Sequence, residues 1–563
     1  MSVFAADRVI DTDVLIAGGG LAGLNAAIAA REQGAEVLVV DKGSLARSGS
    51  IAGGIDHFAA FLNTGPEWDT REGFLRHFAQ KSRGAGDLRI QNAIYCRELT
   101  AAIARMARIG NPLTQPDGTF YRTRSFGRPG AYAINFNGKH LKPKLARETK
   151  RLAAKALERF VTTNLLTADG HVVGATAFGV RTGEFVAIRA KATVLSTGRV
   201  ARIFENHSGL PFNAWQFPGN TGAAQAMAFR AGATLANMEY VLVSVVPHGF
   251  SAAGLNALTG MGGRFINAQG EQFMERYFPK GMNAPRHKLA EAVLTEMREG
   301  RGPVYVDCRH LSEADMSHLN KTLGYDKDTL PDFFRQKRID LAKQPLEVTI
   351  SEGSVGMPCE GTGSGIHIDE KCASTVPGLY AAGDCVDQAS TCAQSTTSGY
   401  VAGREAARFA LSVGALPEPS DKQVSDEKRR VFAPFKRRKG VDYREAEEVL
   451  GKVMSQYVGT ERNELGLQTA LGKLADIEAY ADRLKAANYH YLVRTAEVQD
   501  LLLVARIMAR ASLERKETRF GIYHHRVDYP DTDDANWCGL VLVKKAGESF
   551  DLSFKRLDYS QIP

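Results

Sequence analysis

The first 41 residues contain a strand, a glycine-rich turn, a helix and a second strand, and no other part of the chain constrains the fold as strongly. Residues 13–17 (DVLIA) have the composition of a buried parallel strand, and residues 18–23 (GGGLAG) follow as a GxGxxG turn. Residues 21–33 show helical periodicity, and residues 36–40 (EVLVV) form the next strand, which leads into Asp41. A glycine-rich turn between a strand and a helix indicates a Rossmann-like nucleotide-binding unit.

Each glycine of the turn has its own expected role. Gly18 permits the tight turn, Gly20 lets backbone N–H groups approach a pyrophosphate, and Gly23 lets the helix pack against the strand. The N-terminus of the helix faces the phosphates. Asp41 is expected to accept a hydrogen bond from a ribose hydroxyl, and we include Lys42 in the same site. An accidental glycine turn is the alternative, and the flanking strand and helix argue against it.

Length and composition exclude several classes of protein. The 563-residue chain is long enough for two or three domains, and its 44% hydrophobic and 24% charged residues exclude a disordered or fibrous chain. The formal net charge of +8 suits an anionic ligand or an acidic partner, and it gives no reason to expect nucleic-acid binding. No apolar run approaches the roughly 18 residues that span a membrane. With no leader sequence before the first strand, we expect a soluble, cytoplasmic protein.

The seven cysteines are scattered and include no CxxC pair. Neither a disulfide framework nor a self-contained zinc or iron–sulfur site is therefore predicted, and we expect no metal site. This pattern is typical of a protein in a reducing compartment.

Two later segments repeat the nucleotide-fold pattern. Residues 158–198 contain two short strands and a third strand that runs into Thr197 and Gly198. Residues 378–384 (GLYAAGD) contain another short strand and end at Asp384. The long stretch between the two segments is rich in aromatic residues and glycines, and we interpret it as an inserted domain that covers the substrate.

Further segments resemble a known family. Residues 47–55 (RSGSIAGGI) look like a flavin-cradling loop, residues 262–277 like a capping-domain hairpin, and residues 285–302 like the helix after it. Residues 515–519 (RKETR) and 533–537 (DDANW) look like a C-terminal signature. With the N-terminal turn, these segments resemble the fumarate reductase/succinate dehydrogenase flavoprotein family, which includes L-aspartate oxidase. The C-terminal segments most resemble the alpha subunit of adenylylsulfate reductase.

The resemblance implies an α/β fold with a two-part Rossmann-like FAD-binding domain, an inserted α+β capping domain and a helical C-terminal domain. The expected boundaries are 1–237 for the first part of the FAD-binding domain, 238–355 for the capping domain, 356–420 for the second part, and 421–563 for the C-terminal domain with its terminal strands and loops.

The same resemblance assigns FAD-binding residues beyond the N-terminal turn. These are Ser48, Gly49, Ser50, Gly53, Gly54, Thr197, Gly198, Asp384, Ser395 and Thr396. Asp384 is expected to bind the ribityl chain, and Ser395 to start a helix whose N-terminus faces the flavin and stabilises its anionic reduced form. Family members with covalent flavin have a histidine where this chain has Gly49. We therefore predict non-covalent FAD.

The groups with which this family binds dicarboxylates are mostly replaced. The family's histidine aligns with Ser244, and its second substrate-clamping arginine falls near Ser390. Its Thr-Glu pair falls near Leu255 and Asn256. Because planar carboxylates are held best by bidentate arginine forks, we do not expect fumarate or succinate as a substrate.

The adenylylsulfate reductase pattern is incomplete as well. Its asparagine beside the flavin aligns with Ala59, and its substrate arginine aligns with Val246. The chain is therefore expected to share the scaffold of that enzyme but not its substrate.

Four residues are candidates for catalysis. Arg286 stands in place of the family's proton-delivering arginine, with an anion clamp or a surface arginine as alternatives. Glu360 aligns with a substrate-facing histidine. We expect burial to raise its pKa so that it exchanges a proton with a neutral or cationic substrate, the alternative being a loop carboxylate that accepts from backbone N–H groups. His57 and His248 could also face the substrate, although each could be structural.

The predicted activity is a two-electron transfer between a small-molecule substrate and flavin N5. The chain contains no group to carry electrons away from FAD, so the resemblance implies a ferredoxin-type iron–sulfur partner subunit. The basic residues between 428 and 439 could bind such an acidic partner or simply face solvent. Alternatives are a stand-alone FAD-dependent oxidase, a fumarate-reductase-like enzyme, and a non-catalytic electron-relay flavoprotein.

Overall fold

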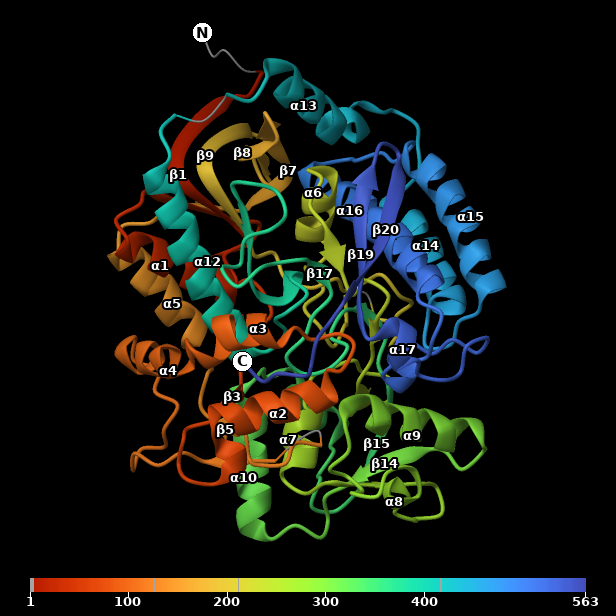
Figure 1. Cartoon of the computed structure of the whole chain (residues 1–563). Helices are drawn as coiled ribbons and strands as arrows, with labels where there is room; N and C mark the ends of the chain where they lie inside the picture. Colours follow the sequence, from red (N-terminus) through yellow and green to blue (C-terminus); the bar gives the residue numbers. More distant parts are fainter. Residues whose placement is uncertain (1–4, 125–126, 211, 416–417) are drawn as a thin grey trace.

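The computed structural model describes residues 5–124, 127–210, 212–415 and 418–563. In Figure 1 the N-terminal sheet and its helices lie at the upper left, the region predicted as the cap lies below them, and the C-terminal helices lie on the right. The predicted α/β class with a helical C-terminal domain is confirmed.

The main sheet holds the nucleotide-fold strands and has the order β6-β2-β1-β9-β8-β7, with β18 also paired to β9. Its strands are β1 (Arg8–Ala17), β2 (Val37–Asp41), β6 (Lys155–Glu158), β7 (Phe160–Ala168), β8 (His171–Gly179), β9 (Phe185–Leu195) and β18 (Leu379–Ala381). β1 pairs in parallel with β2 and β9, and β18 is also parallel to β9. Ala17 pairs with Leu195, which pairs with Ala381, so three strands end together at one edge.

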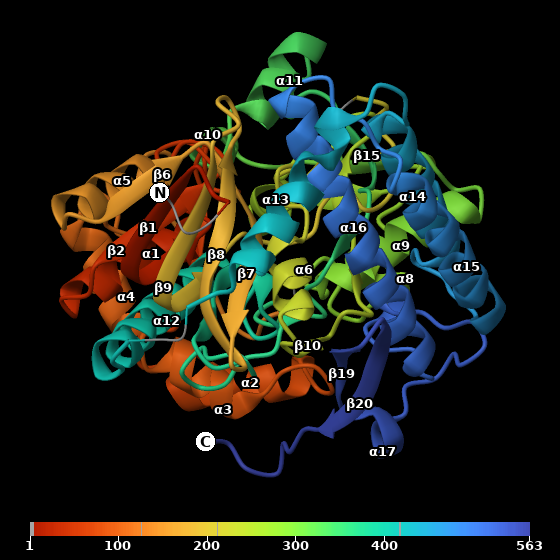
Figure 2. The same cartoon turned by 90° about the horizontal axis from the view of Figure 1, so that it is seen from above.

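Helices cover the sheet, and two of them lie so close to each other that their contact requires glycine. Those nearest the N-terminal unit are α1 (Leu21–Glu32), α4 (Leu99–Arg108), α5 (Leu141–Arg151) and α12 (Cys392–Ser412). Figure 2 shows α1 and α12 on the same side of β1 and β9. A Cβ on Gly403 of α12 would lie 2.0 Å from the Ala26 carbonyl oxygen of α1. The two helices therefore pack backbone to backbone.

Residues between β2 and β6 form a small layer beneath the sheet. It contains β3 (His57–Ala59), η1 (Glu67–Asp69), α2 (Arg71–Lys81), α3 (Leu88–Gln91), η2 (Asn92–Cys96), β4 (Arg122–Thr123) and β5 (Ala133–Asn135). Strands β3, β5 and β4 form an antiparallel sheet.

The region predicted as the cap is an antiparallel sheet with helices. Its sheet has the order β12-β15-β14-β13, formed by β12 (Val245–Pro247), β13 (Arg264–Ile266), β14 (Val304–Asp307) and β15 (Leu346–Ile350). Its helices are α7 (Leu255–Gly260), α8 (Met274–Tyr277), α9 (Arg286–Arg298), α10 (Glu313–Tyr325) and α11 (Thr329–Lys337). The chain enters and leaves this region through the paired strands β11 (Val241–Leu242) and β16 (Ser354–Val355).

The C-terminal region is helical and ends in a hairpin. Its elements are α13 (Asp421–Lys436), α14 (Tyr443–Tyr457), α15 (Glu464–Ala481), α16 (Tyr489–Glu514), η4 (Gly521–Tyr523), α17 (Asp534–Trp537), β19 (Gly539–Ala546) and β20 (Ser549–Arg556). The hairpin extends a sheet with β10 (Leu235–Ala236) and β17 (Gly365–Ile366), and α6 (Ala223–Arg230) packs near it. The buried Arg515 binds Glu239 and Glu517 at 2.7 Å each. This region is therefore an integral part of the fold.

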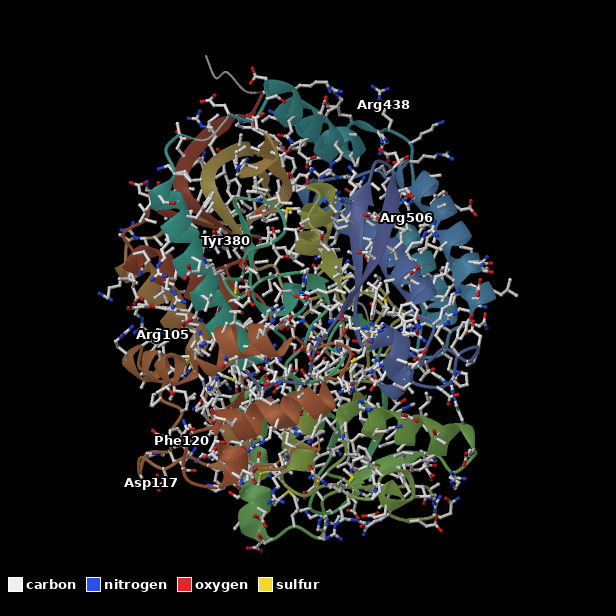
Figure 3. All side chains as sticks on the ribbon, viewed as in Figure 1. Arg105, Asp117, Phe120, Tyr380, Arg438 and Arg506 are labelled. Carbon is white, nitrogen blue, oxygen red and sulfur yellow. The ribbon has the colours of Figure 1, made fainter. Side chains whose placement is uncertain are left out.

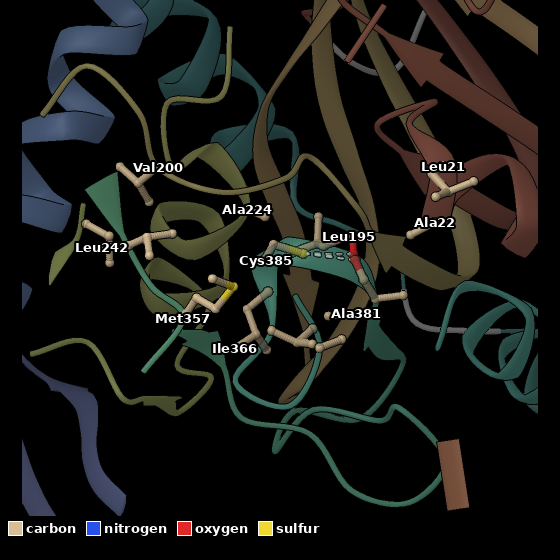
Figure 4. Packing of buried hydrophobic residues seen from close by; sticks show 14 of the residues in the cluster. Leu21, Ala22, Leu195, Val200, Ala224, Leu242, Met357, Ile366, Ala381 and Cys385 are labelled. Atoms are coloured by element: carbon tan, nitrogen blue, oxygen red, sulfur yellow. Dashed lines mark hydrogen bonds between the residues drawn. The ribbon is translucent and has the colours of Figure 1, made fainter. Parts of the chain in front are cut away.

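The main apolar core joins the sheet to the cavity wall. Figure 4 shows Leu195 and Ala381 beside Cys385, whose thiol donates to the Leu195 carbonyl at 3.3 Å. Cys385 belongs to η3 (Gly383–Cys385), which follows β18. The core thus fixes where Asp384 leaves the sheet. Within the described ranges, none of the helices combines the length and apolarity needed to cross a membrane.

Candidate active site

A cavity of about 880 Å³ lies at the edge where β1, β9 and β18 end. Its lining runs from Gly20 and Asp41 through Thr197 and Asp384 to Arg286 and Glu360. Ligands of open parallel sheets bind outside the carboxyl ends of the strands, and this cavity has that position. One continuous space therefore joins the predicted nucleotide site to the predicted catalytic residues.

The glycine turn has the geometry expected from its sequence. Gly18 has φ +102°, and a Cβ on it would lie 2.6 Å from the Ser196 carbonyl oxygen. A Cβ on Gly23 would lie 1.9 Å from the Gly18 carbonyl oxygen, so Gly23 packs the helix against the turn and does not line the cavity. A Cβ on Gly20 would meet nothing closer than 3.8 Å. Its backbone is open to the cavity.

Asp41 stabilises the turn as well as facing the cavity. Its Oδ2 accepts from the Gly19 N–H at 2.8 Å, and its Oδ1 accepts from the Gly43 N–H at 2.7 Å. Lys42 also lines the cavity, and its ammonium lies 2.9 Å from the Glu497 carboxylate of α16. The adenosine end of the predicted site is therefore closed by the C-terminal region.

The flavin-cradling loop divides into two parts. Ser48, Gly49 and Ser50 line the cavity, where a bound cofactor would meet them. Gly53 and Gly54 do not, and their assignment as cofactor-binding residues is corrected. A Cβ on Gly53 would lie 3.1 Å from the Lys327 side chain, and one on Gly54 would lie 2.1 Å from the Asp326 carbonyl oxygen. These glycines instead allow the region predicted as the cap to lie directly on the loop.

The helix expected to start at Ser395 starts three residues earlier. α12 begins at Cys392, and the Thr391 hydroxyl caps it by accepting from the Gln394 N–H. Thr391, Cys392 and Ser395 line the cavity, so the N-terminal turn faces it. Thr396 does not line it, because it lies on the next face of the helix and donates to the Cys392 carbonyl. The threonine N-cap was the missed signal.

Arg286 is held in place by three neighbours. It begins α9 and is 9% exposed. Its Nη1 donates to the Ser244 hydroxyl at 3.0 Å, and its Nη2 donates to Asn256 Oδ1 at 3.0 Å. Its Nε lies 3.6 Å from Glu360 Oε1. Arg286 is therefore a buried cavity residue, and the surface-arginine alternative is excluded.

Glu360 lies in a basic environment, which corrects the expected pKa shift. Burial raises the pKa of Glu360, but the charges of Lys81, Arg286 and Arg128 outweigh burial and hold it below its usual value. Lys81 Nζ lies 3.9 Å from Glu360 Oε2, and burial in turn lowers the pKa of Lys81. Glu360 is therefore an ionised carboxylate at neutral pH. In this form it is suited to accept a proton or to hold charge.

His57 reaches the cavity at the start of β3. Its Nδ1 lies 2.6 Å from Asp56 Oδ1, and its Nε2 lies 3.1 Å from the Asn256 side-chain amide. Since Asn256 also accepts from Arg286, a hydrogen-bonded chain runs from Asp56 through His57 and Asn256 to Arg286. Burial raises the pKa of Asp56, and the charge of His57 helps to bring it below the usual value.

His248 is not part of the site. Its side chain is 62% exposed, and its ring lies 3.7 Å from the Glu347 carboxylate. β12 ends at Pro247, and His248 lies in the turn that follows, outside the cavity lining. The prediction that His248 faces the substrate is wrong.

Most of the positions at which the sequence predicts a departure from the family that it resembles lie at the cavity. Ser244, Asn256 and Ser390 all line it, as does Ala59. Val246 does not. The replaced carboxylate-binding groups therefore change the surface that a substrate would meet.

Comparisons with known proteins agree with this geometry. The family model described as FAD binding domain matches residues 13–398, and the one described as fumarate reductase flavoprotein C-term matches residues 447–563. The chain belongs to the fumarate reductase/succinate dehydrogenase flavoprotein family. It is an FAD-dependent oxidoreductase, as its sequence predicted.

Curated relatives of this flavoprotein extend over nearly its whole length. It is 28% identical to an uncharacterized FAD-dependent oxidoreductase of Methanocaldococcus jannaschii, with 98% of each chain covered. It is also 28% identical to one subunit of the fumarate reductase (CoM/CoB) of Methanothermobacter marburgensis, covering 96% of this chain and 98% of that one.

The fold of the flavoprotein is that of solved family structures. Adenylylsulfate reductase from Archaeoglobus fulgidus superposes with a TM-score of 0.89 at 24% identity, covering 99% of this chain and 97% of that one. E. coli quinol fumarate reductase superposes with a TM-score of 0.84 at 23% identity, covering 99% and 98%.

The residues of the cavity fit FAD. α1 begins after Gly20 without a side-chain cap, so its first N–H groups are available to phosphates. The Ser48 hydroxyl is buried at the cavity wall without a hydrogen-bond partner in the described part of the chain, as expected of a group that binds a cofactor. A Cβ on Gly49 would meet nothing closer than 3.7 Å, which leaves room for a flat ring system.

Sequence analysis missed four charged residues of the flavoprotein site. Lys81 ends α2 beside Glu360, Arg128 lines the cavity from a loop, Asp56 binds His57, and Arg199 follows the Thr197-Gly198 turn. None of them belongs to a spaced motif. Only residues 196–199 (STGR), in which an arginine directly follows the predicted turn, could have drawn attention to Arg199.

Proposed function

We propose that this flavoprotein transfers two electrons between a small-molecule substrate, bound under the region predicted as the cap, and FAD, and exchanges electrons with an iron–sulfur partner. The observation that carries the proposal is the continuous cavity from Gly20 to Arg286 and Glu360. A relay protein would have no need of buried charged groups at the far end of such a cavity.

The chain supplies binding, orientation and charge. Gly20, Ser48 and Gly49 would hold FAD, with Asp384 and the start of α12 beside it. Bound FAD would supply a two-electron acceptor or donor at N5. Arg286 is oriented by Ser244 and Asn256, so that its position does not depend on the substrate.

Glu360 is the group that we assign to proton transfer. As an ionised carboxylate beside Lys81 and Arg286, it would accept a proton from a substrate undergoing oxidation and return it in the reverse reaction. The expectation of a neutral or cationic substrate treated Glu360 as an anion without nearby cations. Because Lys81, Arg286 and Arg128 offset its negative charge, Glu360 is no longer a reason to exclude an anionic substrate.

We infer a partner because the described residues show no site for an electron carrier besides FAD. Across the described residues no group of three His, Cys, Asp or Glu side chains could hold a metal ion, and the seven cysteines are free. The relative from Methanothermobacter marburgensis is by its name one subunit of a fumarate reductase, which supports an assembly with other chains. The iron–sulfur nature of the partner follows from the family resemblance.

The basic segment at residues 428–439 is a weaker candidate for the partner surface than its composition suggests. Lys428 pairs with Asp7 at 2.7 Å, and Arg430 pairs with Glu427 at 2.7 Å. Arg438, labelled in Figure 3, lies at the surface beyond α13. Only the end of the segment is therefore positioned to attract an acidic protein.

The rates of flavin reoxidation test this function against its alternatives. The FAD-loaded protein is reduced anaerobically and mixed with a 2[4Fe–4S] ferredoxin or with dioxygen. Faster reoxidation by the ferredoxin supports the proposed function, whereas fast reoxidation by dioxygen alone favours the stand-alone oxidase. A relay protein would exchange electrons equally well after replacement of Arg286 and Glu360, and no small-molecule substrate would reduce its flavin.

A further inference from the structure

Arg199 is a buried arginine that the predicted site did not include. It is 4% exposed and lines the cavity four residues after the end of β9. Gly198 before it has φ +85°, and a Cβ on Gly198 would lie 2.9 Å from the Asn220 side chain. The turn therefore fixes the point at which Arg199 enters the cavity wall.

Only one of its three guanidinium nitrogens has a hydrogen-bond partner among the described residues. Nη2 donates to Asp384 Oδ2 at 3.1 Å and to the Ser390 carbonyl oxygen at 3.3 Å. Nε and Nη1 have no acceptor there. Because buried polar groups are nearly always paired, these two N–H groups indicate an acceptor on a bound molecule.

Arg286 differs from Arg199 in this respect. Its two terminal nitrogens donate to Ser244 and Asn256, and its Nε faces Glu360. Its fork is therefore engaged by the protein. The family's second clamping arginine is predicted to fall near Ser390, whose hydroxyl accepts from the Gly361 N–H at 3.1 Å and carries no charge.

Arg199 supplies a positive charge near Ser390, where the family's arginine is missing, and it comes from the turn after β9. Its guanidinium contacts the Ser390 carbonyl, and Ser390 contacts the residue after Glu360. Burial raises the pKa of Tyr523, and the charges of Arg286, Glu360 and Arg199 all act on its buried phenol, so the three charged groups lie within electrostatic range of one side chain.

The charges at this end of the cavity favour an anion. The cations in or beside this end of the cavity are Lys81, Arg128, Arg199, Arg286 and Lys327, and the anions are Glu360, Asp384, Asp56 and Asp326. A cleft in which cations outnumber anions attracts negatively charged ligands.

We propose that Arg199 binds a carboxylate of the substrate through Nε and Nη1, and that it selects an anionic substrate in place of the arginine that the chain lacks at Ser390. This inference rests on the proposed function, since it places the substrate in the cavity beside the flavin. Two adjacent N–H groups of a guanidinium match the two oxygens of a planar carboxylate. With the fork of Arg286 engaged, one carboxylate should be enough for binding.

Three probes of similar shape test the proposal: malonate, its monoamide malonamate, and the neutral malonamide. Each is titrated into the FAD-loaded protein and followed by calorimetry and by the flavin absorbance. We expect malonate and malonamate to bind with similar affinity and malonamide to bind at least about 10-fold more weakly. Equal affinity for malonamide, or no binding of malonate, would overturn the proposal.

Arg199 variants locate the effect. Arg199→Gln should weaken malonamate binding by about 10- to 100-fold, and Arg199→Lys should weaken it less because the charge remains without the fork. Arg408→Gln, on the exposed side of α12, is the matched control and should bind as wild type does. If Arg199→Gln does not retain FAD, the Arg199→Lys variant tests the proposal instead. We expect its affinity for malonamate to be at least about threefold lower than that of wild type.

Two outcomes would contradict the role of Arg199. Malonamate binding within about twofold of wild type in both variants would exclude it as the carboxylate contact. A change confined to FAD affinity or to the flavin reduction potential would show that Arg199 serves the flavin. Electron exchange with ferredoxin needs no substrate, so the proposed function is judged separately from these titrations.

Discussion

Arg286 Nε lies 3.6 Å from Glu360 Oε1, although the two residues come from different parts of the chain. Arg286 begins α9 in the region predicted as the cap, and Glu360 lies in the loop between β16 and β17. Their contact places a cation beside the carboxylate that we assign to proton transfer. Replacing either residue should therefore change the other's electrostatic environment.

Glu360→Gln should slow flavin reduction by substrate by about 10²–10⁴-fold, because the amide keeps the shape of the carboxylate but cannot accept a proton. The reductive half-reaction is measured by stopped flow, with FAD content determined for each preparation. Glu296→Gln, which replaces another buried carboxylate away from the cavity, is the control. A rate for Glu360→Gln within about threefold of wild type would refute the assignment.

Lys81→Met should move the pH profile of the same reaction. The charge of Lys81 helps to hold the pKa of Glu360 below its usual value, so its removal should raise that pKa. A base is active when deprotonated, and the acid limb of the rate profile should therefore shift to higher pH. An unchanged limb with a uniformly lower rate would show that Lys81 has only a structural role.

FAD should be released intact when the protein is precipitated with acid. Gly49 has no side chain with which to form a covalent flavin link, although it lines the cavity. All the yellow colour is expected in the supernatant, identified as FAD by chromatography. Flavin that remains on the denatured chain would contradict this prediction.

Neither succinate oxidation nor fumarate reduction should reach a substantial rate. Ser244, Asn256 and Ser390 line the cavity, and the sequence resemblance predicts them at or near positions of the family's carboxylate-binding groups. The first two engage Arg286. Assays in both directions with an artificial electron carrier check this expectation. Robust turnover would mean that our alignment of these positions is wrong.

Glu497→Gln should destabilise the protein at neutral pH by on the order of 3 kcal/mol, with an effect that fades in acid. Glu497 contacts Lys42 at 2.9 Å, Arg202 at 3.0 Å and Arg494 at 2.6 Å. Burial raises the pKa of Glu497, but the charges of Lys42, Arg202 and Arg494 outweigh it and bring it to about 2.

The sign of the pH dependence follows from this depressed pKa. The stabilisation is fully present above the unfolded pKa of Glu497 and is lost as the pH falls through the folded value of about 2. Melting temperatures of wild type and Glu497→Gln should therefore differ more at about pH 7 than at about pH 3. Glu448→Gln, in an exposed pair with Lys452, should leave stability unchanged. An equal difference in melting temperature between wild type and Glu497→Gln at both pH values would contradict the electrostatic explanation.

The sequence by itself determined the nucleotide-binding unit. Gly18, Gly20 and Gly23 act through backbone geometry within a few residues, and β1, α1 and β2 follow from local periodicity. The structure that such short-range patterns form can be predicted from the sequence alone, because it depends only on neighbouring residues. The same holds for FAD and for the family, since both rest on ordered local motifs.

Only the tertiary structure decided the far end of the cavity. Lys81, Arg199 and Arg286 reach Glu360 and its surroundings from α2, from the turn after β9 and from α9, and no spacing in the sequence relates them. A carboxylate's pKa is set by the charges around it in space, which is why the direction expected for Glu360 was wrong. His248 failed as a site residue for a related reason: it lies one residue past the end of β12, with its side chain exposed and outside the cavity lining.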